Sequence, residues 1–166
     1  SRTSSTNASA SATARFEVRG SELLGHAAPA DTVAEAEAFV EEVRDEHADA
    51  THTVPAYRVP AGDHGAPPSG TEPLLREYAS DDGEPSDSAG KPVLSLLHGR
   101  ELEIVCLVIT RYFGGTELRV VGLVRAYSQA AHDALDPPDP TDRPRHIRFP
   151  AVVDYDDSGT IGGILE

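Results

Sequence analysis

The chain has 166 residues, which is enough for one domain with a sizeable hydrophobic core. Its 28 acidic residues outnumber the 14 basic ones and give a formal net charge of −14. This charge argues against broad affinity for nucleic acid, DNA included, because such binding neutralises many phosphates with many bases. No run of residues approaches the roughly 18 apolar positions of a membrane span. Cys106 is the only cysteine, so no intrachain disulfide can form, and we expect a cytoplasmic protein.

The N-terminal third of the chain predicts a tail, a hairpin and one amphipathic helix. Residues 1–14, rich in Ser, Thr and Ala, have the composition of a disordered tail. Loose alternation with two glycines over 15–28 indicates two strands joined by a turn. The sequence Thr32-Val33-Ala34-Glu35 has the form of a capping box and predicts a helix that runs to about His47. One stripe of this helix is apolar and the remainder acidic, which indicates a solvated face, with docking of a basic partner as the alternative.

The middle of the chain predicts two strands, a loop and a short helix. Residues 50–59 are typical of a strand, although Pro55 favours an edge strand or a bulge. The stretch 61–73 predicts a long loop, and 74–80 predicts another short strand. A helix over 91–98 has a proline in its first turn, where a missing amide hydrogen breaks no helical hydrogen bond.

The C-terminal part of the sequence, from Ile104 to residue 135, predicts the central strand of the sheet and the last helix of the domain. The run from Ile104 to Ile109 is apolar on both alternate faces and rich in β-branched residues, which predicts a central strand with Cys106 as a buried thiol. Residues 122–135 predict a helix that the following prolines terminate. Together the elements predict an α/β (α+β) two-layer sandwich, in which a small sheet packs against helices.

Two glycine-bearing segments flank the central strand and contain most of the candidate site residues. The first, residues 81–92, places Gly83 and Gly90 before a helix whose first amides form a natural anion cradle, with Lys91 beside it. Its spacing does not fit a nucleotide-binding P-loop, and Pro92 stands where that loop needs a hydroxyl. The acids of this segment could hold a hard cation, but closing a turn is their commoner role. These acids are Asp81, Asp82 and Glu84.

The second segment, residues 110–115, ends the central strand. Arg111 can bind a phosphate or carboxylate with both arms of its guanidinium, and the glycines at 114 and 115 let a ligand backbone approach closely. The rings of Tyr112 and Phe113 can stack, and Arg125 could face the same groove. Ligands gather at such strand ends in open α/β sheets. We expect one cationic crevice here, formed with Lys91 of the first segment.

Several of these residues also have a structural interpretation. Arg111 could instead pair with Asp81 or Asp82 and clip the two loops together, an alternative of equal weight. His52 is more often structural than catalytic, because no Ser, Cys or carboxylate stands at a recognisable catalytic spacing. We therefore expect no catalytic nucleophile, no metal and no cofactor.

Six stretches, in their order and spacing, resemble the IMPACT/YigZ family over about residues 16 to 135. They are Ala50-Thr51-His52, Ala56-Tyr57, Asp82-Gly83-Glu84-Pro85-Ser86, Ala89-Gly90-Lys91-Pro92, Thr110-Arg111-Tyr112-Phe113-Gly114-Gly115 and Gly122-Leu123-Val124-Arg125-Ala126-Tyr127. The resemblance implies a domain similar to domain IV of elongation factor G, a ribosomal protein second-domain-like fold. It also implies a cytoplasmic role around translation: eukaryotic relatives regulate an initiation-factor kinase by binding its activator, whereas prokaryotic members have no settled biochemical function.

The chain departs from the family pattern at two places. Residues 117–122 lack a lysine and two glycines that relatives typically carry, which weakens a backbone phosphate nest, although Arg119 partly restores the charge. Asp87 replaces a usual glycine. Relatives often continue into a small ferredoxin-like domain. We expect the family domain over 15–138, then a linker and the beginning of a truncated second domain over 139–166, with its first strand near 147–155.

The leading functional hypothesis is a non-enzymatic, translation-associated regulator that binds RNA or a ribosome-associated protein. The expected binding residues are His52, Asp82, Gly83, Glu84, Lys91, Arg111, Tyr112, Gly114, Gly115 and Arg125. One alternative is a protein-binding regulator without nucleic-acid contact. Another is a hydrolytic or small-molecule enzyme that uses His52 and Asp82.

The acidic, lysine-poor composition predicts a halophilic protein whose stability depends on salt. Self-repulsion among the acids opposes folding at low ionic strength, and it is screened as the Debye length falls from about 10 Å at 0.1 M salt to about 3 Å at 1 M. The melting temperature should therefore rise strongly with KCl. A melting temperature that does not change with KCl would contradict this prediction.

Overall fold

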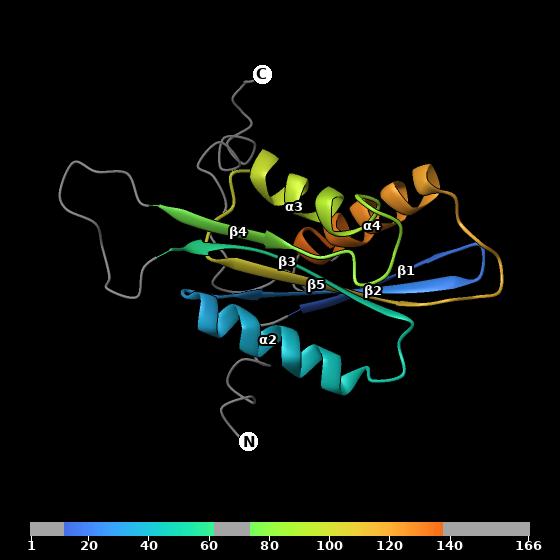
Figure 1. Cartoon of the computed structure of the whole chain (residues 1–166), viewed down its shortest axis with the longest axis horizontal. Helices are drawn as coiled ribbons and strands as arrows, with labels where there is room; N and C mark the ends of the chain where they lie inside the picture. The colour runs from blue at the N-terminus through green and yellow to red at the C-terminus, as the bar shows by residue number, and fades with distance from the viewer. Residues whose placement is uncertain (1–11, 62–73, 138–166) are drawn as a thin grey trace.

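The computed structural model describes residues 12–61 and 74–137 (Figure 1). The expectations for residues 1–11, 62–73 and 138–166, including the second-domain segment, lie outside the described residues. The described elements are β1 (Ala12–Val18), β2 (Ser21–Pro29), α2 (Val33–Glu46), β3 (His52–Pro60), β4 (Leu75–Ala79), α3 (Gly90–Gly99), β5 (Val105–Tyr112) and α4 (Val120–Leu135). β1 begins at Ala12, so residues 12–14 belong to the sheet. The prediction that these three residues are part of a disordered tail is therefore wrong.

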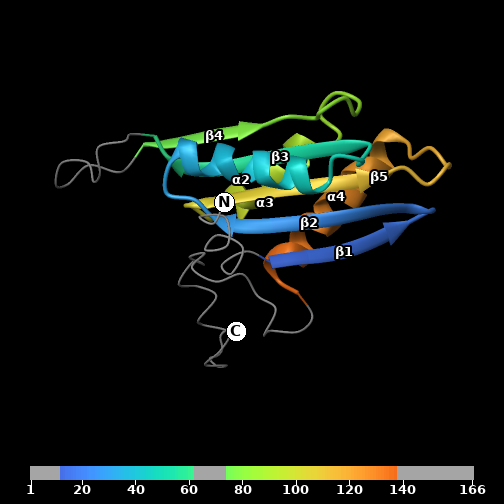
Figure 2. The same ribbon diagram turned by 90° about the horizontal axis from the view of Figure 1, so that it is seen from below.

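The sheet is antiparallel throughout, with the strand order β1-β2-β5-β3-β4. β5 lies in its middle, between β2 and β3 (Figure 2). Every residue from Val105 to Ile109 is fully buried. The uninterrupted apolar run therefore forms the central strand, and this prediction is confirmed.

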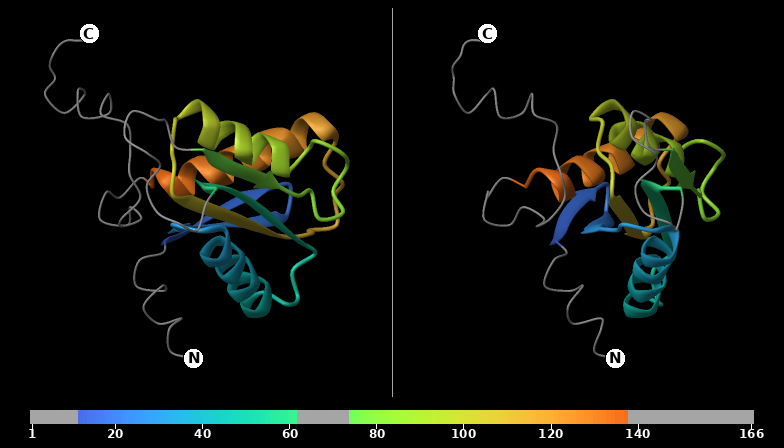
Figure 3. Two further views of the ribbon diagram at one scale, coloured as in Figure 1. Left: turned by 60° about the vertical axis from the view of Figure 1, so that its left-hand side comes forward. Right: turned by 90° about the vertical axis from the view of Figure 1, so that its left-hand side faces the viewer.

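Helices cover both faces of the sheet (Figures 1 and 3). α3 and α4 pack on the face that includes Leu107 and Ile109, whereas α2 packs on the face of Cys106 and Val108. Successive side chains of a strand point to opposite faces, so β5 serves both hydrophobic cores. The α+β fold predicted from the sequence is confirmed, but the helices form a layer on each face of the sheet and not the single helical layer of a two-layer sandwich. None of the described helices is long and apolar enough to cross a membrane.

Local sequence signals determine where the first elements turn and begin. Arg19 and Gly20 both have positive φ, +48° and +85°, as a tight hairpin turn between β1 and β2 requires. At the start of α2, the Thr32 hydroxyl accepts a hydrogen bond from the amide of Glu35 at 3.1 Å. The Glu35 carboxylate accepts from the amide of Asp31 at 2.8 Å, one residue earlier than the usual partner of a capping box. The predicted hairpin and helix start are both confirmed.

The prediction that Pro55 marks an edge strand or a bulge is wrong. β3 is an interior strand between β5 and β4, and its register with β5 runs without interruption through Pro55. The Pro55 carbonyl accepts from the amide of Ser80, just beyond the end of β4. Because the nitrogen and carbonyl of one residue point to the same side of a strand, the missing N–H also faces this end of β4 and not the central strand. The proline thus costs no hydrogen bond to β5.

A buried histidine bridges β1, β2 and β5 on the α2 side of the sheet. His26 is 5% exposed, and its ring nitrogens lie 3.3 Å from the Thr13 hydroxyl and 3.2 Å from the Thr110 hydroxyl. The Thr110 hydroxyl donates to the Leu24 carbonyl, so it accepts from Nε2–H of His26. Burial, with a smaller contribution from the nearby His47, lowers the pKa of His26 to about 4. The imidazole is therefore neutral in the folded chain.

This lowered pKa predicts a loss of stability in mild acid. An unfolded His26 takes up its proton near the ordinary value of 6.5, whereas the folded one resists it down to about 4. The stabilisation is complete above pH 6.5 and declines as the pH falls toward 4, by about 3 kcal/mol in all. Denaturant unfolding between pH 7 and pH 4 should show this slope in the wild type and a shallower one in His26→Gln. Equal slopes for the two proteins would contradict the prediction.

Candidate functional site

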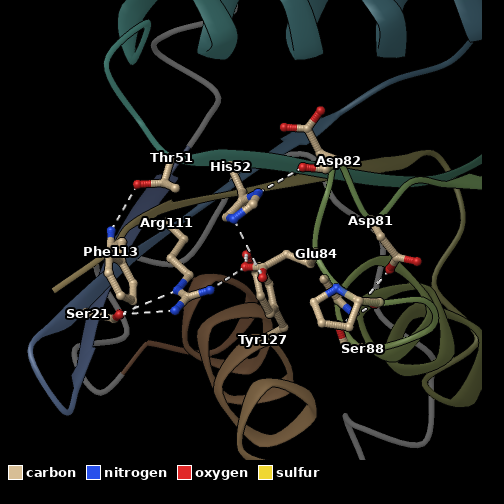
Figure 4. Close-up of polar contacts among 12 residues, drawn as sticks. Ser21, Thr51, His52, Asp81, Asp82, Glu84, Ser88, Arg111, Phe113 and Tyr127 are labelled. Carbon is tan, nitrogen blue, oxygen red and sulfur yellow. Dashed lines mark hydrogen bonds and ion pairs between the residues drawn. The ribbon is translucent and has the colours of Figure 1, made fainter. Parts of the chain in front are cut away.

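The two glycine-bearing segments meet at one end of the sheet, to the right in Figure 1. Four connections gather there: residues 19–20, 47–51, 80–89 and 113–119, which we call the loop end. Hydrogen bonds tie them together, such as Phe113 N–H to the Thr51 hydroxyl at 3.0 Å (Figure 4). Thr53 N–H donates to the Asp82 carboxylate at 2.8 Å. The two segments therefore meet in space, as the sequence predicts.

A buried carboxylate stands at the centre of the loop end. Glu84 is 8% exposed, and its Oε2 accepts from Nη1 of Arg111 at 2.6 Å and from the Tyr127 hydroxyl at 2.7 Å (Figure 4). Arg111 is itself 4% exposed, and its other nitrogens lie 3.4 Å from the Ser21 hydroxyl. We call Glu84, Arg111, Tyr127 and Ser21 the buried network. It connects the β4–α3 loop to β5, α4 and β2.

The turn that carries Glu84 is built from the DGE sequence. Asp82 and Gly83 have φ of +46° and +92°, which reverses the chain directly before Glu84. The Asp82 carboxylate accepts from Thr53 N–H at 2.8 Å and lies 3.7 Å from the guanidinium of Arg44. The turn is thereby fixed on β3, and Glu84 is directed inward. Gly83 supplies a backbone conformation here, and Asp82 an internal contact.

His52 also contacts this turn, but not as a catalytic pair with Asp82. Its Nδ1 lies 2.8 Å from the backbone carbonyl of Asp82, so that nitrogen carries the hydrogen and donates. Its Nε2 lies 3.6 Å from Oε1 of Glu84. The Asp82 carboxylate is engaged elsewhere, and the Glu84 carboxylate is held by Arg111 and Tyr127. The imidazole and carboxylate of the hypothetical His52–Asp82 enzyme site are not hydrogen-bonded to each other.

Tyr127 belongs to the buried network, a role that the sequence did not predict. Burial, and then its hydrogen bond to Glu84, raises the pKa of the phenol well above its ordinary value. The hydroxyl therefore stays protonated and donates to the carboxylate. One sequence signal could have predicted this role: Tyr127 is the only residue with a hydroxyl on the apolar face of the predicted helix. The other residues of that face are Leu123, Ala130 and Ala134. Ser21 was also missed, and nothing in the sequence marks it.

The predicted anion cradle at the start of α3 is filled by the protein's own carboxylate. Asp81 Oδ1 accepts from the amides of Gly90 and Ala89, at 2.8 and 3.2 Å, and Oδ2 accepts from the amide of Asp87 at 2.9 Å. Burial alone would raise the pKa of Asp81, but these three hydrogen bonds lower it. A Cβ on Gly90 would lie 2.6 Å from the carbonyl oxygen of Ser80, so glycine is needed for the close approach. The cradle is a helix cap.

Gly114 and Gly115 differ in their surroundings. A Cβ on Gly114 would lie 2.0 Å from the carbonyl oxygen of Gly20, so this glycine allows the β1–β2 turn to pack against the end of β5. Gly115 has φ of +95° and no atom near its hypothetical Cβ. Close approach at Gly114 is thus made by the chain itself and not left to a ligand.

Tyr112 and Arg111 point to opposite faces of the sheet, so they cannot share the expected groove. Consecutive strand residues alternate, and Arg111 faces α4 while the Tyr112 hydroxyl lies 2.8 Å from His47 Nδ1 and donates to Asp49 on the α2 side. The guanidinium of Arg111 lies 5.6 Å from the ring centre of Phe113. Of the two aromatic residues, only Phe113 accompanies Arg111.

The single cationic crevice expected from the sequence is not formed in the described part of the chain. Two surface cavities there include Lys91, and neither includes Arg111 or Arg125. Arg111 is buried and neutralised by Glu84, and Arg125 is exposed on α4. The alternative that Arg111 clips the loops together holds, with Glu84 as its partner in place of Asp81 or Asp82. No cluster of three or more metal-binding side chains occurs among the described residues.

The geometry defines an α+β domain with an antiparallel sheet whose connecting loops are held at one end by a buried ion pair. A model of the Impact N-terminal domain matches residues 19–135. The chain is 36% identical over 119 residues to the IMPACT family member YvyE of Bacillus subtilis, covering 72% of this chain and 50% of YvyE. It is 40% identical to the IMPACT family member YigZ of Escherichia coli, covering 72% and 54%. The chain therefore belongs to the IMPACT family.

One solved structure has a clearly similar fold. The crystal structure of a hypothetical protein superposes with a TM-score of 0.66 at 35% identity, covering 85% of this chain and 60% of that one. The two-domain translational regulator Yih1 gives a TM-score of 0.49 at 22% identity, covering 76% of this chain and 46% of that one. The chain spans about half the length of the curated relatives it matches.

The buried network should make a large contribution to stability. Glu84→Gln leaves Arg111 buried without a counter-charge, which we expect to lower the free energy of unfolding by about 3 to 5 kcal/mol. Replacing both partners at once, by Glu84→Leu with Arg111→Met, should cost less than Glu84→Gln alone. Glu41→Gln, which removes one partner of an exposed ion pair with Arg44, is the control and should change stability little. A Glu84→Gln protein as stable as the control, measured by denaturant unfolding, would show that Arg111 does not depend on Glu84.

Proposed function

We propose that this domain is a non-enzymatic binding module of translation that contacts RNA on the ribosome through its loop end. Membership of the IMPACT family supports the link to translation, because the family resemblance implies a role there. The observation that carries the contact surface is an exposed aromatic residue on a rigid support: Phe113 is 47% exposed and directly follows β5, whose end is fixed by the buried network. Because the backbone at Phe113 is already fixed, binding a ligand to the ring would cost little conformational entropy.

The chemistry of the neighbouring residues fits RNA in a non-duplex form. Unpaired bases stack on exposed aromatic rings, and arginines nearby neutralise phosphates. Arg119 is exposed at the start of α4, and Arg19 is exposed on the turn that packs against Gly114. Since Arg111 is neutralised internally, these two exposed arginines replace it in the proposed contact. Binding should be local and modest, because the protein as a whole is strongly acidic.

A protein partner at the same surface is the second candidate. Val120 and Val121, in the first turn of α4, are 50% and 64% exposed. Exposed β-branched side chains near an exposed phenylalanine favour contact with an apolar protein surface. A ribosome-associated protein could therefore occupy the loop end without any RNA. Whether binding to ribosomes survives digestion of exposed RNA distinguishes the two candidates.

The test is co-sedimentation with purified ribosomes in the KCl concentration at which the domain is most stable. Phe113→Ala and Arg119→Gln should each lower the bound fraction at least fivefold, because they remove a stacking surface and a phosphate contact. Tyr78→Ala and Arg76→Gln are the matched controls on β4, since Tyr78 is 43% exposed and Arg76 is also exposed. Sensitivity to RNase supports RNA contact, and resistance supports the protein partner. If all four variants sediment like the wild type, the loop end is not the contact surface.

A further inference from the structure

The outer edge of β4 presents unpaired backbone groups. β4 is the last strand of the sheet, and no strand in the described ranges lies beyond it. The amide of Ser80 bonds to Pro55 and the amide of Ala61 bonds to the Leu74 carbonyl, which fixes the ladder between β3 and β4. Antiparallel ladders alternate, so Arg76 and Tyr78 direct their N–H and C=O groups toward β3. Glu77 and Ala79 therefore direct theirs outward.

A cavity runs along this free edge. It has a volume of about 370 Å³ and is lined by four consecutive residues, 77–80, at the end of β4. Gly90, Lys91 and Leu94 of α3 form the opposite wall. A groove between an edge strand and a helix is the geometry in which an extended peptide adds to a sheet, with backbone hydrogen bonds for affinity and side-chain pockets for specificity.

The walls of the groove are held in place independently of any ligand. The Asp81 carboxylate binds the first amides of α3, and Gly90 packs against the backbone of Ser80. The buried face of α3, which includes Val93 and Leu97, belongs to the core that the sheet forms with α3 and α4. A strand that enters the groove would therefore meet a preformed surface, and the cost of ordering it would be small.

The charges of the groove favour a carboxylate on the ligand. Lys91, the only lysine of the chain, is exposed and is the only cation among the described residues that line this cavity. Two of the acids in the wall are engaged: Glu77 with Arg58 and His98, and Asp81 with backbone amides. Asp87 is the remaining acid. A second cavity of about 580 Å³ shares Lys91 and continues between α3 and α4 over apolar side chains. These side chains include Pro92, Leu96 and Val124.

We propose that the edge of β4 binds an extended segment of a partner protein as a sixth strand. The backbone of that segment bonds to Glu77 and Ala79, an acidic side chain pairs with Lys91, and an apolar side chain packs on Leu94. Neither Phe113 nor Arg119 lines this groove, although it shares part of residues 80–89 with the loop end. The variants Phe113→Ala and Arg119→Gln therefore test the RNA contact without testing this inference.

The experiment uses an array of eight-residue peptides in which Val and Thr alternate and one Glu is placed at each position in turn. Matched peptides carry Gln or Lys in place of Glu. We expect Glu peptides to bind at least tenfold more tightly than Gln peptides, and Lys91→Gln to remove most of this preference. In the wild-type chain, bound peptide should slow hydrogen exchange at the amides of Glu77 and Ala79, and leave Arg76 and Tyr78 unchanged.

Ala79→Pro is the decisive variant, because it removes an outward N–H without removing a hydrogen bond to β3. It should weaken peptide binding at least tenfold, whereas the control Arg119→Gln, at an exposed residue that does not line the groove, should bind peptide like the wild type. Equal binding by both variants, a preference for Lys peptides, or no protection at Glu77 and Ala79 would each overturn the proposal. Analytical ultracentrifugation provides a further test. If the wild type is a dimer and Ala79→Pro is a monomer, a second copy of the chain occupies the edge, and the proposal is overturned.

Discussion

The loop end depends on one buried ion pair between Glu84 and Arg111. Removing two charges from water is costly, and the pair is tolerable only because further groups complete the hydrogen bonding of both partners. Tyr127 donates to the same carboxylate oxygen, and Ser21 faces the remaining guanidinium nitrogens. These contacts come from four separate elements, so their combined effect is to fix the relative positions of the loops. A rigid loop end follows from the completeness of this network.

The elements of the fold could be predicted because their signals are local. An apolar run such as Ile104 to Ile109 requires burial on both faces, and the Thr32 capping box requires a helix start, wherever the rest of the chain lies. The prediction for Pro55 is wrong because the effect of a proline in a sheet depends on which neighbouring strand its missing N–H faces. That direction is set by the register between β3 and β4, which no property of residues 50–59 determines.

The site could be predicted as a pair of segments but not as a geometry. Arg111 and Tyr112 are adjacent in sequence and were assigned to one groove, although strand alternation alone sends them to opposite faces. The partner of Arg111 is Glu84 and not the neighbouring aspartates, because the positive φ of Asp82 and Gly83 reverses the chain before Glu84. Asp81 does not pair with Arg111 and instead caps the start of α3. These outcomes depend on backbone torsions that composition and spacing do not specify.

The charged residues and glycines of the family stretches make contacts within this chain, so they account for the shape of the loops and not for the choice of a partner. Glu84, Arg111 and Gly114 lie within the stretches that carry the resemblance, and each is engaged within the chain itself. They explain why the loops adopt one shape, but a side chain that is buried and neutralised cannot select a partner. In the proposed contact, selection falls to exposed positions around this support, such as Phe113 and residues 117–121, where the chain departs from the family pattern. A shared scaffold does not by itself determine which partner is bound.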